Sequence, residues 1–109
     1  MADYAHIRSV SEIDDLIAQS HDKPVIFFKH SLTCPISSAG FRQYETFLAD
    51  QSADGEAIYT LIEIQNARDV SNEIAQRTGV KHESPQALLM RDGTVTWHAS
   101  HWSIQAEAL

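Results

Sequence analysis

Hydrophobic residues recur every three or four positions in three segments of the chain, a spacing that places side chains on one face of a helix. The first segment follows Ser9, which lies three residues before Glu12 as in a capping box, and ends before Pro24. The second begins at Pro35, since proline suits the first helical position. The expected inward residues are Ile13, Leu16 and Ile17 in the first helix, Phe41, Tyr44, Phe47 and Leu48 in the second, and Val70, Ile74 and Ala75 in the third.

The hydrophobic runs between these helices are short and rich in β-branched and aromatic residues, as strands are. Residues 25–28 are apolar on both faces, which indicates a central buried strand. Residues 57–64 predict a second strand. Two further runs, 86–90 and 94–98, flank Asp92-Gly93, a pair typical of the tight turn in an antiparallel hairpin.

The remaining elements complete the expected order of the fold. Asp69 is expected to cap the third helix and Gly79 to end it, Ser103 to cap a short terminal helix, and residues 4–8 to add an edge strand. The order β-α-β-α-β-β-α, with the first helix and the edge strand in front of it, predicts an α/β fold in which a central mixed sheet of four or five strands is flanked by helices. Because we find no repeat or linker, residues 1–109 are expected to form a single domain, and the order is similar to that of thioredoxin.

Composition and charge exclude several classes of partner. Hydrophobic residues make up 43% of the chain and charged residues 21%, which suits a globular core. The formal net charge is −7 and the basic residues form no run, which argues against nucleic acid or an anionic membrane as a partner. No apolar stretch approaches the roughly 20 residues of a membrane span, and the start, MADYAHIRSV, lacks the pattern of a signal peptide. We therefore expect a cytoplasmic protein, in a compartment that keeps thiols reduced.

The chain has one cysteine, Cys34, at the junction of the first strand and the second helix, in the stretch KHSLTCPISS. The free amides and the dipole of a helix start favour the thiolate, and cysteines there have pKa values of about 3.5 to 7.5. The alternative is a structural thiol, since cysteine is among the most buried residue types. The step Thr33-Cys34-Pro35 between a buried strand and an amphipathic helix favours a nucleophile. Ser37 can donate a hydrogen bond to this thiol but cannot resolve a mixed disulfide, which leaves a monothiol reaction.

Ser84-Pro85, at the start of the strand after the third helix, has two interpretations. The simpler is a trans proline that opens a strand, since only about 5% of X–Pro bonds in folded proteins are cis. The functional interpretation is a cis-proline turn that faces Cys34, where the backbone of Ser84 pairs with an extended thiol peptide as an added strand does. The functional interpretation is favoured because the distance from Cys34 along the chain matches the layout of thioredoxin.

Three stretches, KHSLTCPISS, SPQALLMRDG and WHASHWSI, closely resemble the monothiol bacilliredoxins, general-stress proteins of the thioredoxin superfamily. The resemblance implies an oxidoreductase that removes bacillithiol from protein mixed disulfides, with Cys34 as nucleophile. Ser37 matches the position of the resolving cysteine in dithiol relatives, and Pro85 matches the cis-proline. It further implies no bound metal or organic cofactor, bacillithiol or another low-molecular-weight thiol as co-substrate, and S-thiolated cytosolic proteins as partners.

Two other functions fit a thioredoxin-like chain with one cysteine. One is an iron–sulfur carrier of the monothiol glutaredoxin type, in which two protomers and two external thiols supply four ligands. The Cys-Gly-Phe-Ser motif of those proteins differs from this chain at Pro35 and Ile36, which disfavours that function. The other is a non-enzymatic adaptor with a spent active site.

Several polar residues near the predicted site have structural interpretations. Strand alternation sends one of Lys29 and His30 away from Cys34, and we expect Lys29 to be solvated. A metal site needs three or four convergent ligands, whereas His98 and His101 are only two. We expect these histidines, with Ser100 and Trp102, to fix the corner after the hairpin, and Trp97 to lie in the core.

Overall fold

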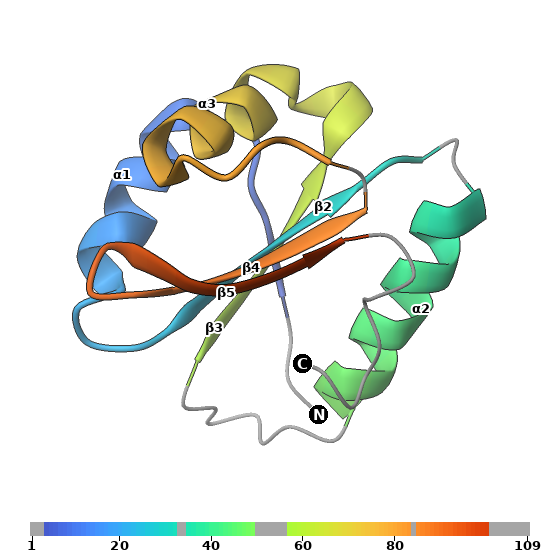
Figure 1. Cartoon of the computed structure of the whole chain (residues 1–109), viewed down its shortest axis with the longest axis horizontal. Helices are drawn as coiled ribbons and strands as arrows, with labels where there is room; N and C mark the ends of the chain where they lie inside the picture. Colours follow the sequence, from blue (N-terminus) through green and yellow to red (C-terminus); the bar gives the residue numbers. More distant parts are fainter. Residues whose placement is uncertain (1–3, 33–34, 50–56, 84, 101–109) are drawn as a thin grey trace.

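The computed structural model describes residues 4–32, 35–49, 57–83 and 85–100, with the backbone alone for 35–37 and 49. It contains a five-stranded sheet in the order β1-β3-β2-β4-β5, with α1 and α3 against one face and α2 against the other (Figure 1). The elements are β1 Ala5–His6, α1 Val10–Gln19, β2 Val25–His30, α2 Pro35–Ala49, β3 Ile58–Glu63, the short 3₁₀ helix η1 Ile64–Asn66, α3 Arg68–Thr78, β4 Gln86–Arg91 and β5 Thr94–Ser100.

The sheet is mixed, as the order of elements predicts. β1 and β2 both run parallel to β3, whereas β4 pairs antiparallel with β2 and with β5. The carboxyl ends of β2 and β3 therefore lie beside the start of β4, so three connecting segments meet at one end of the sheet. The edge strand expected within residues 4–8 is confirmed as β1.

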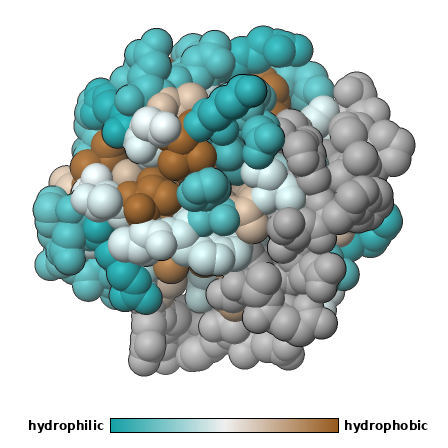
Figure 2. Space-filling model, in the orientation of Figure 1, coloured by the Kyte–Doolittle hydropathy of each residue, from teal (hydrophilic) through white to brown (hydrophobic). Residues whose placement is uncertain are grey.

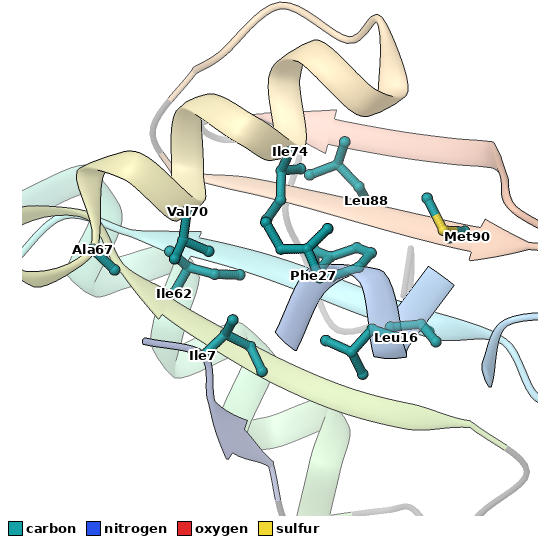
Figure 3. Packing of buried hydrophobic residues seen from close by; sticks show 11 residues of the cluster. Ile7, Leu16, Phe27, Ile62, Ala67, Val70, Ile74, Leu88 and Met90 are labelled. Atoms are coloured by element: carbon teal, nitrogen blue, oxygen red, sulfur yellow. The ribbon is translucent and has the colours of Figure 1, made fainter. Parts of the chain in front are cut away.

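All six residues of β2 are buried, as expected for a central strand covered on both faces. Val25 and Phe27 belong to a core under α1 and α3, which Figure 3 shows around Ile62, Ile74 and Leu88. Ile26 and Phe28 belong to a second core under α2. In that second core, the ring of Phe28 stacks on Tyr44, with centroids 4.6 Å apart, and the Tyr44 hydroxyl donates to the carbonyl of Thr60 at 3.0 Å.

The helix boundaries confirm some of the predicted end signals and correct others. Ser9 is the N-cap of α1, but its hydroxyl donates to the carboxylate of Glu12 at 3.1 Å and does not bond a backbone amide. The N-cap of α3 is Ala67, so the expectation that Asp69 caps this helix is wrong: Asp69 lies in the first turn and accepts from the amide of Val70. Gly79 ends α3 in the left-handed conformation with φ 73°, as predicted.

The predicted hairpin is confirmed, with φ of 51° at Asp92 and 75° at Gly93. Positive φ at both positions is the requirement of a type I′ turn. The turn is held to the end of α1, because the amide of Gly93 donates to Ser20 Oγ at 2.8 Å. The helix expected after Ser103 lies outside the described residues.

The surface of the described residues is mostly polar. On the face in Figure 2, several hydrophobic residues gather in a small group on the side where α1 and the hairpin lie, and hydrophilic residues cover most of the remaining described surface. Among the large hydrophobic side chains described, Leu32 is the exposed one, at 45%. No helix in the described part of the chain is long and apolar enough to cross a membrane.

Candidate active site

The predicted nucleophile, Cys34, immediately precedes the first residue of α2. The chain leaves β2 at His30 and enters α2 at Pro35, so strand and helix are joined by four residues. Thr33 and Cys34 lie outside the described residues, and Pro35 and Ser37 are described by their backbone, in the first turn of α2. The first amides of a helix lack partners within the helix, and its N-terminus carries partial positive charge. The predicted junction of strand and helix at this cysteine is therefore present in the fold.

Pro85, the residue before β4, packs against α2. It is buried, and a Cβ atom added to Gly40 of α2 would lie 3.1 Å from Pro85 Cγ and 3.3 Å from Pro85 Cβ. This contact lies less than two turns from the start of α2. The structure thus brings Pro85 to the helix that Cys34 precedes, although 51 positions separate the two residues along the chain. Ser84 lies outside the described residues, and the cis geometry of the bond before Pro85 stays a prediction.

Gln65 holds the segment that leads to the cysteine, a role that the sequence analysis missed. Its Oε1 accepts from the amide of Leu32 at 2.9 Å, and its Nε2 donates to Ser31 Oγ at 2.9 Å. Gln65 lies in η1, directly after β3, and the parallel pairing of β2 with β3 puts both strand ends side by side. The parallel pairing predicted for these two strands was therefore the feature of the sequence that could have indicated this contact.

His30 points to the α2 face of the sheet. Its side chain is buried and its ring stacks on Phe41 of α2, with centroids 4.8 Å apart and an interplanar angle of 26°. It lies four residues before Cys34, so the end of β2 is packed against the same helix that the cysteine precedes.

Lys29 lies on the opposite face, and the expectation that it is solvated is wrong: its exposed fraction is 0%. Its ammonium donates to the carbonyl oxygen of Ser71 in α3 at 3.0 Å and lies 3.3 Å from His82 Nδ1. Burial lowers the pKa of Lys29 from 10.5 to about 8, because a charged amine loses solvation in the interior. The alternation of Lys29 and His30 is as predicted, but α3 and the segment after it cover the lysine completely.

His98, in the C-terminal hairpin, does not form a metal site with other described residues. No three His, Cys, Asp or Glu side chains converge within the described ranges. His98 is exposed on β5, whereas Trp97 is partly buried against the core under α2, as predicted. His101 and Trp102 lie outside the described part of the chain.

The sheet order, the cysteine at the start of α2 and the proline packed on that helix define a thioredoxin-like protein with a single thiol. The model of one family, described as monothiol bacilliredoxin BrxC, matches residues 5–109, and the chain belongs to this family. It is accordingly a monothiol thiol–disulfide oxidoreductase.

Solved structures agree with this assignment. A candidate oxidoreductase with a thioredoxin fold is 32% identical, with a TM-score of 0.81, over 96% of this chain and 88% of that one. A thioredoxin of Malassezia sympodialis, at 12% identity and a TM-score of 0.73, covers 93% of this chain and 81% of its own. The thioredoxin pre-protein of Schistosoma mansoni, at 11% identity and a TM-score of 0.73, covers 94% and 90%. The two thioredoxins show likeness of fold alone.

Substituting Gln65→Ala removes both hydrogen bonds to the segment before Cys34. We expect kcat/KM for thiol exchange to fall about fivefold, while the free energy of unfolding falls by about 2 kcal/mol, because two bonds are lost and each is worth about 1 kcal/mol. Asn66→Ala is the matched control, since the side chain of this exposed neighbour donates to Glu63, at 3.4 Å, on its own side of the site. Equal exchange rates for the two variants would show that Gln65 does not hold the reactive segment.

Substituting Gly40→Ala tests the contact with Pro85. The added Cβ pushes a rigid, buried ring by a few tenths of an ångström, while alanine favours the helix by about 1 kcal/mol. We therefore expect the free energy of unfolding to change by less than about 1 kcal/mol, and exchange activity to fall. Thr46→Ala, on the exposed surface of the same helix, serves as control. Full activity in Gly40→Ala would indicate that this spacing does not matter to the reaction.

Substituting Lys29→Met is expected to raise the free energy of unfolding at pH 7 by up to about 3 kcal/mol, since each unit of pKa shift corresponds to about 1.4 kcal/mol. Between pH 8 and 10.5 the unfolded wild-type chain binds more protons than the folded one, so wild-type stability rises with pH and the gap closes. Urea unfolding at pH 7 and pH 10 measures both values. Lys23→Met, at an exposed position, should show no such convergence; a gap for Lys29→Met that is the same at both pH values would contradict the burial of charge.

Proposed function

We propose that this oxidoreductase removes bacillithiol, or a similar low-molecular-weight thiol, from mixed disulfides of cytosolic proteins through Cys34. The observation that carries the proposal is the position of the chain's one cysteine directly before α2, on which Pro85 packs. Membership of the monothiol bacilliredoxin family supports the choice of small thiol.

The start of α2 favours the reactive form of the cysteine. A thiolate at this position receives hydrogen bonds from the unpaired amides of the first helical turn and is stabilised by the helix dipole. Thr33 and Pro35 flank it in the sequence, and Ser37 follows in the first turn of α2. Because the thiolate is the nucleophile in disulfide exchange, these groups support attack by Cys34 near neutral pH.

The reaction is two successive exchanges. The Cys34 thiolate attacks the bacillithiol sulfur of the mixed disulfide; a bond forms between these sulfurs, and the bond to the protein sulfur breaks. The protein leaves as a thiolate and takes a proton from solvent. A second small thiol, as thiolate, then attacks the sulfur carried by Cys34, which releases a small-molecule disulfide and restores the Cys34 thiolate. Ser37 has no sulfur for the second step, so an external thiol is the reductant, and the protein needs no bound metal or organic cofactor.

The protein substrate lies along the turn before β4. The backbone of Ser84, next to Pro85, pairs with an extended segment on one side of the modified cysteine, as an added strand does. Leu32, exposed and two residues before Cys34, offers an apolar contact beside the reacting sulfur. Such a site accepts many S-thiolated proteins, because backbone pairing is independent of side-chain identity. This breadth suits repair of protein thiols under oxidative stress.

Mass spectrometry of the purified chain after incubation with a bacillithiolated peptide tests the proposal. We expect the mass of one bacillithiol on Cys34, release of the free peptide thiol, and no adduct on Cys34→Ser. Restoring a second thiol with Ser37→Cys should remove the adduct and leave an internal disulfide. An unmodified Cys34, while a free cysteine in the same mixture is converted, would refute the proposed reaction.

A further inference from the structure

The segment between α3 and the turn at Pro85 is held by a buried ammonium that the exchange reaction does not use. Figure 1 shows this segment, residues 79–83, running from α3 to the start of β4, beside the end of β2. Lys29 Nζ lies 3.3 Å from His82 Nδ1 and donates to the carbonyl oxygen of Ser71. Ser71 Oγ also lies 3.1 Å from the same His82 nitrogen. We call Lys29, Ser71 and His82 the lysine anchor.

A second polar side chain from the sheet holds the same segment. Gln86 Nε2 donates to the carbonyl oxygen of Lys81 at 3.0 Å. Gln86 is the antiparallel register partner of Lys29, so both side chains leave the sheet on the face covered by α3. Two consecutive residues of the segment are therefore fixed to neighbouring positions of β2 and β4, three and four positions before Pro85.

Both contacts are made at a cost in stability. Lys29 is a fully buried cation whose described partners include no carboxylate. Gln86 is 1% exposed, and its Oε1 is a buried acceptor with no hydrogen-bond partner among the described residues. Apolar side chains of similar volume would avoid a buried charge and an unsatisfied acceptor. Two such costs at one short segment indicate selection for its position, since local rules are broken mainly at functional sites.

The lysine anchor requires a charged lysine and a neutral histidine, because His82 Nδ1 accepts the hydrogen bond. His82 is itself exposed, but partial loss of solvation lowers its pKa, and the charges of Lys29 and Arg68 lower it further. Glu83, in the segment itself, opposes this effect. The pKa of Lys29 is about 8. Near neutral pH both groups are therefore in the required state, and acidification protonates His82 and places two cations side by side.

We propose that Lys29 and Gln86 are positioning residues for thiol exchange with protein substrates: they fix residues 79–83 and so preset the turn at Pro85. The inference rests on the proposed function, which assigns that turn to binding an extended peptide. It deepens that function by separating two substrate classes. A peptide mixed disulfide needs the preset turn, whereas a small disulfide or an alkylating reagent needs only the sulfur of Cys34.

The test compares Lys29→Met with wild type on three reagents at pH 7. We expect KM for a bacillithiolated peptide to rise about tenfold, somewhat less than the full loss of a charged hydrogen bond would give, because Ser71 Oγ still lies beside His82 Nδ1. We expect kcat to change less than about twofold. Reduction of a small symmetrical disulfide and alkylation by iodoacetamide should proceed at the wild-type rate. His21→Leu, at the opposite end of the sheet beside Asp92, is the control and should match wild type on all three.

Variants of His82 separate the anchor from general packing. His82→Leu removes the acceptor and should raise KM for the peptide as Lys29→Met does. His82→Asn keeps an acceptor oxygen near the position of Nδ1 and should restore KM at pH 7. For wild type we expect KM for the peptide to rise below the ordinary histidine pKa of about 6.5, as His82 becomes protonated. His82→Asn should abolish this rise, because asparagine does not titrate. Gln86→Met should raise KM for the peptide without lowering the free energy of unfolding.

Hydrogen exchange provides a readout that does not depend on activity. Amides of residues 79–83 should exchange faster in Lys29→Met than in wild type, although that variant is more stable overall. An unchanged KM for the peptide in Lys29→Met, or an equal loss on all three reagents, would overturn the positioning role. If wild-type Cys34 reacts with iodoacetamide but never with the mixed disulfide, the proposed function fails, whereas the exchange data still decide whether the anchor holds the segment.

Discussion

The arrangement of the site depends on the close contact between the Pro85 ring and the backbone of Gly40. A glycine in the interior of a helix lowers helix stability by about 1 kcal/mol relative to alanine, and α2 has one where the proline ring approaches. The missing side chain lets the turn before β4 lie directly against the helix that follows Cys34. Two segments that are distant in sequence thereby become the two sides of one site. The stacked rings of Phe28 and Tyr44 keep the same helix on the sheet, so the separation of the two sides is set by rigid elements.

The contacts around this site fix its connecting segments, and those of Lys29 and Gln86 do so at a cost in stability. Gln65 ties the segment before the cysteine to the end of β3, and Lys29 and Gln86 tie the segment before the proline to β2 and β4. In each case a polar side chain from a regular element reaches a connecting segment. Connecting segments carry the chemistry in many folds but are also the parts that move most. Because side chains of the regular elements hold these connecting segments, the reacting groups are positioned by the rigid sheet.

The sequence predicted most of the fold because its elements are marked by local signals. An apolar run made β2 a central strand, Asp92-Gly93 marked the hairpin, and Gly79 marked the end of α3. Asp69 was misplaced as a cap because α3 begins at Arg68, two residues earlier than an Asp69 cap would imply, with Ala67 as its N-cap. The first residue of α3 depends on where η1 ends, and no local sequence pattern indicates that position.

The candidate site was predictable in part, for the same reason. The proximity of Pro85 to the helix after Cys34 follows from element order, and the two-residue period of β2 correctly put Lys29 and His30 on opposite faces. The burial of Lys29 and the reach of Gln65 were not predictable. Both depend on which segment covers a strand end in three dimensions, and a lysine next to a loop is usually solvated.

The shortness of β1 has a consequence for handling the protein. In the described part of the chain, the outer edge of β3 is covered by two paired residues of β1, together with the amide of Ile7, which donates to the carbonyl of Leu61 at 2.9 Å. Removal or displacement of those first residues leaves β3, an apolar strand, with unpaired backbone N–H and C=O groups. An exposed edge of this kind is a common site of pairing with the sheet of another molecule. A tag or fusion that displaces β1 therefore promotes oligomers whose formation is unrelated to thiol exchange.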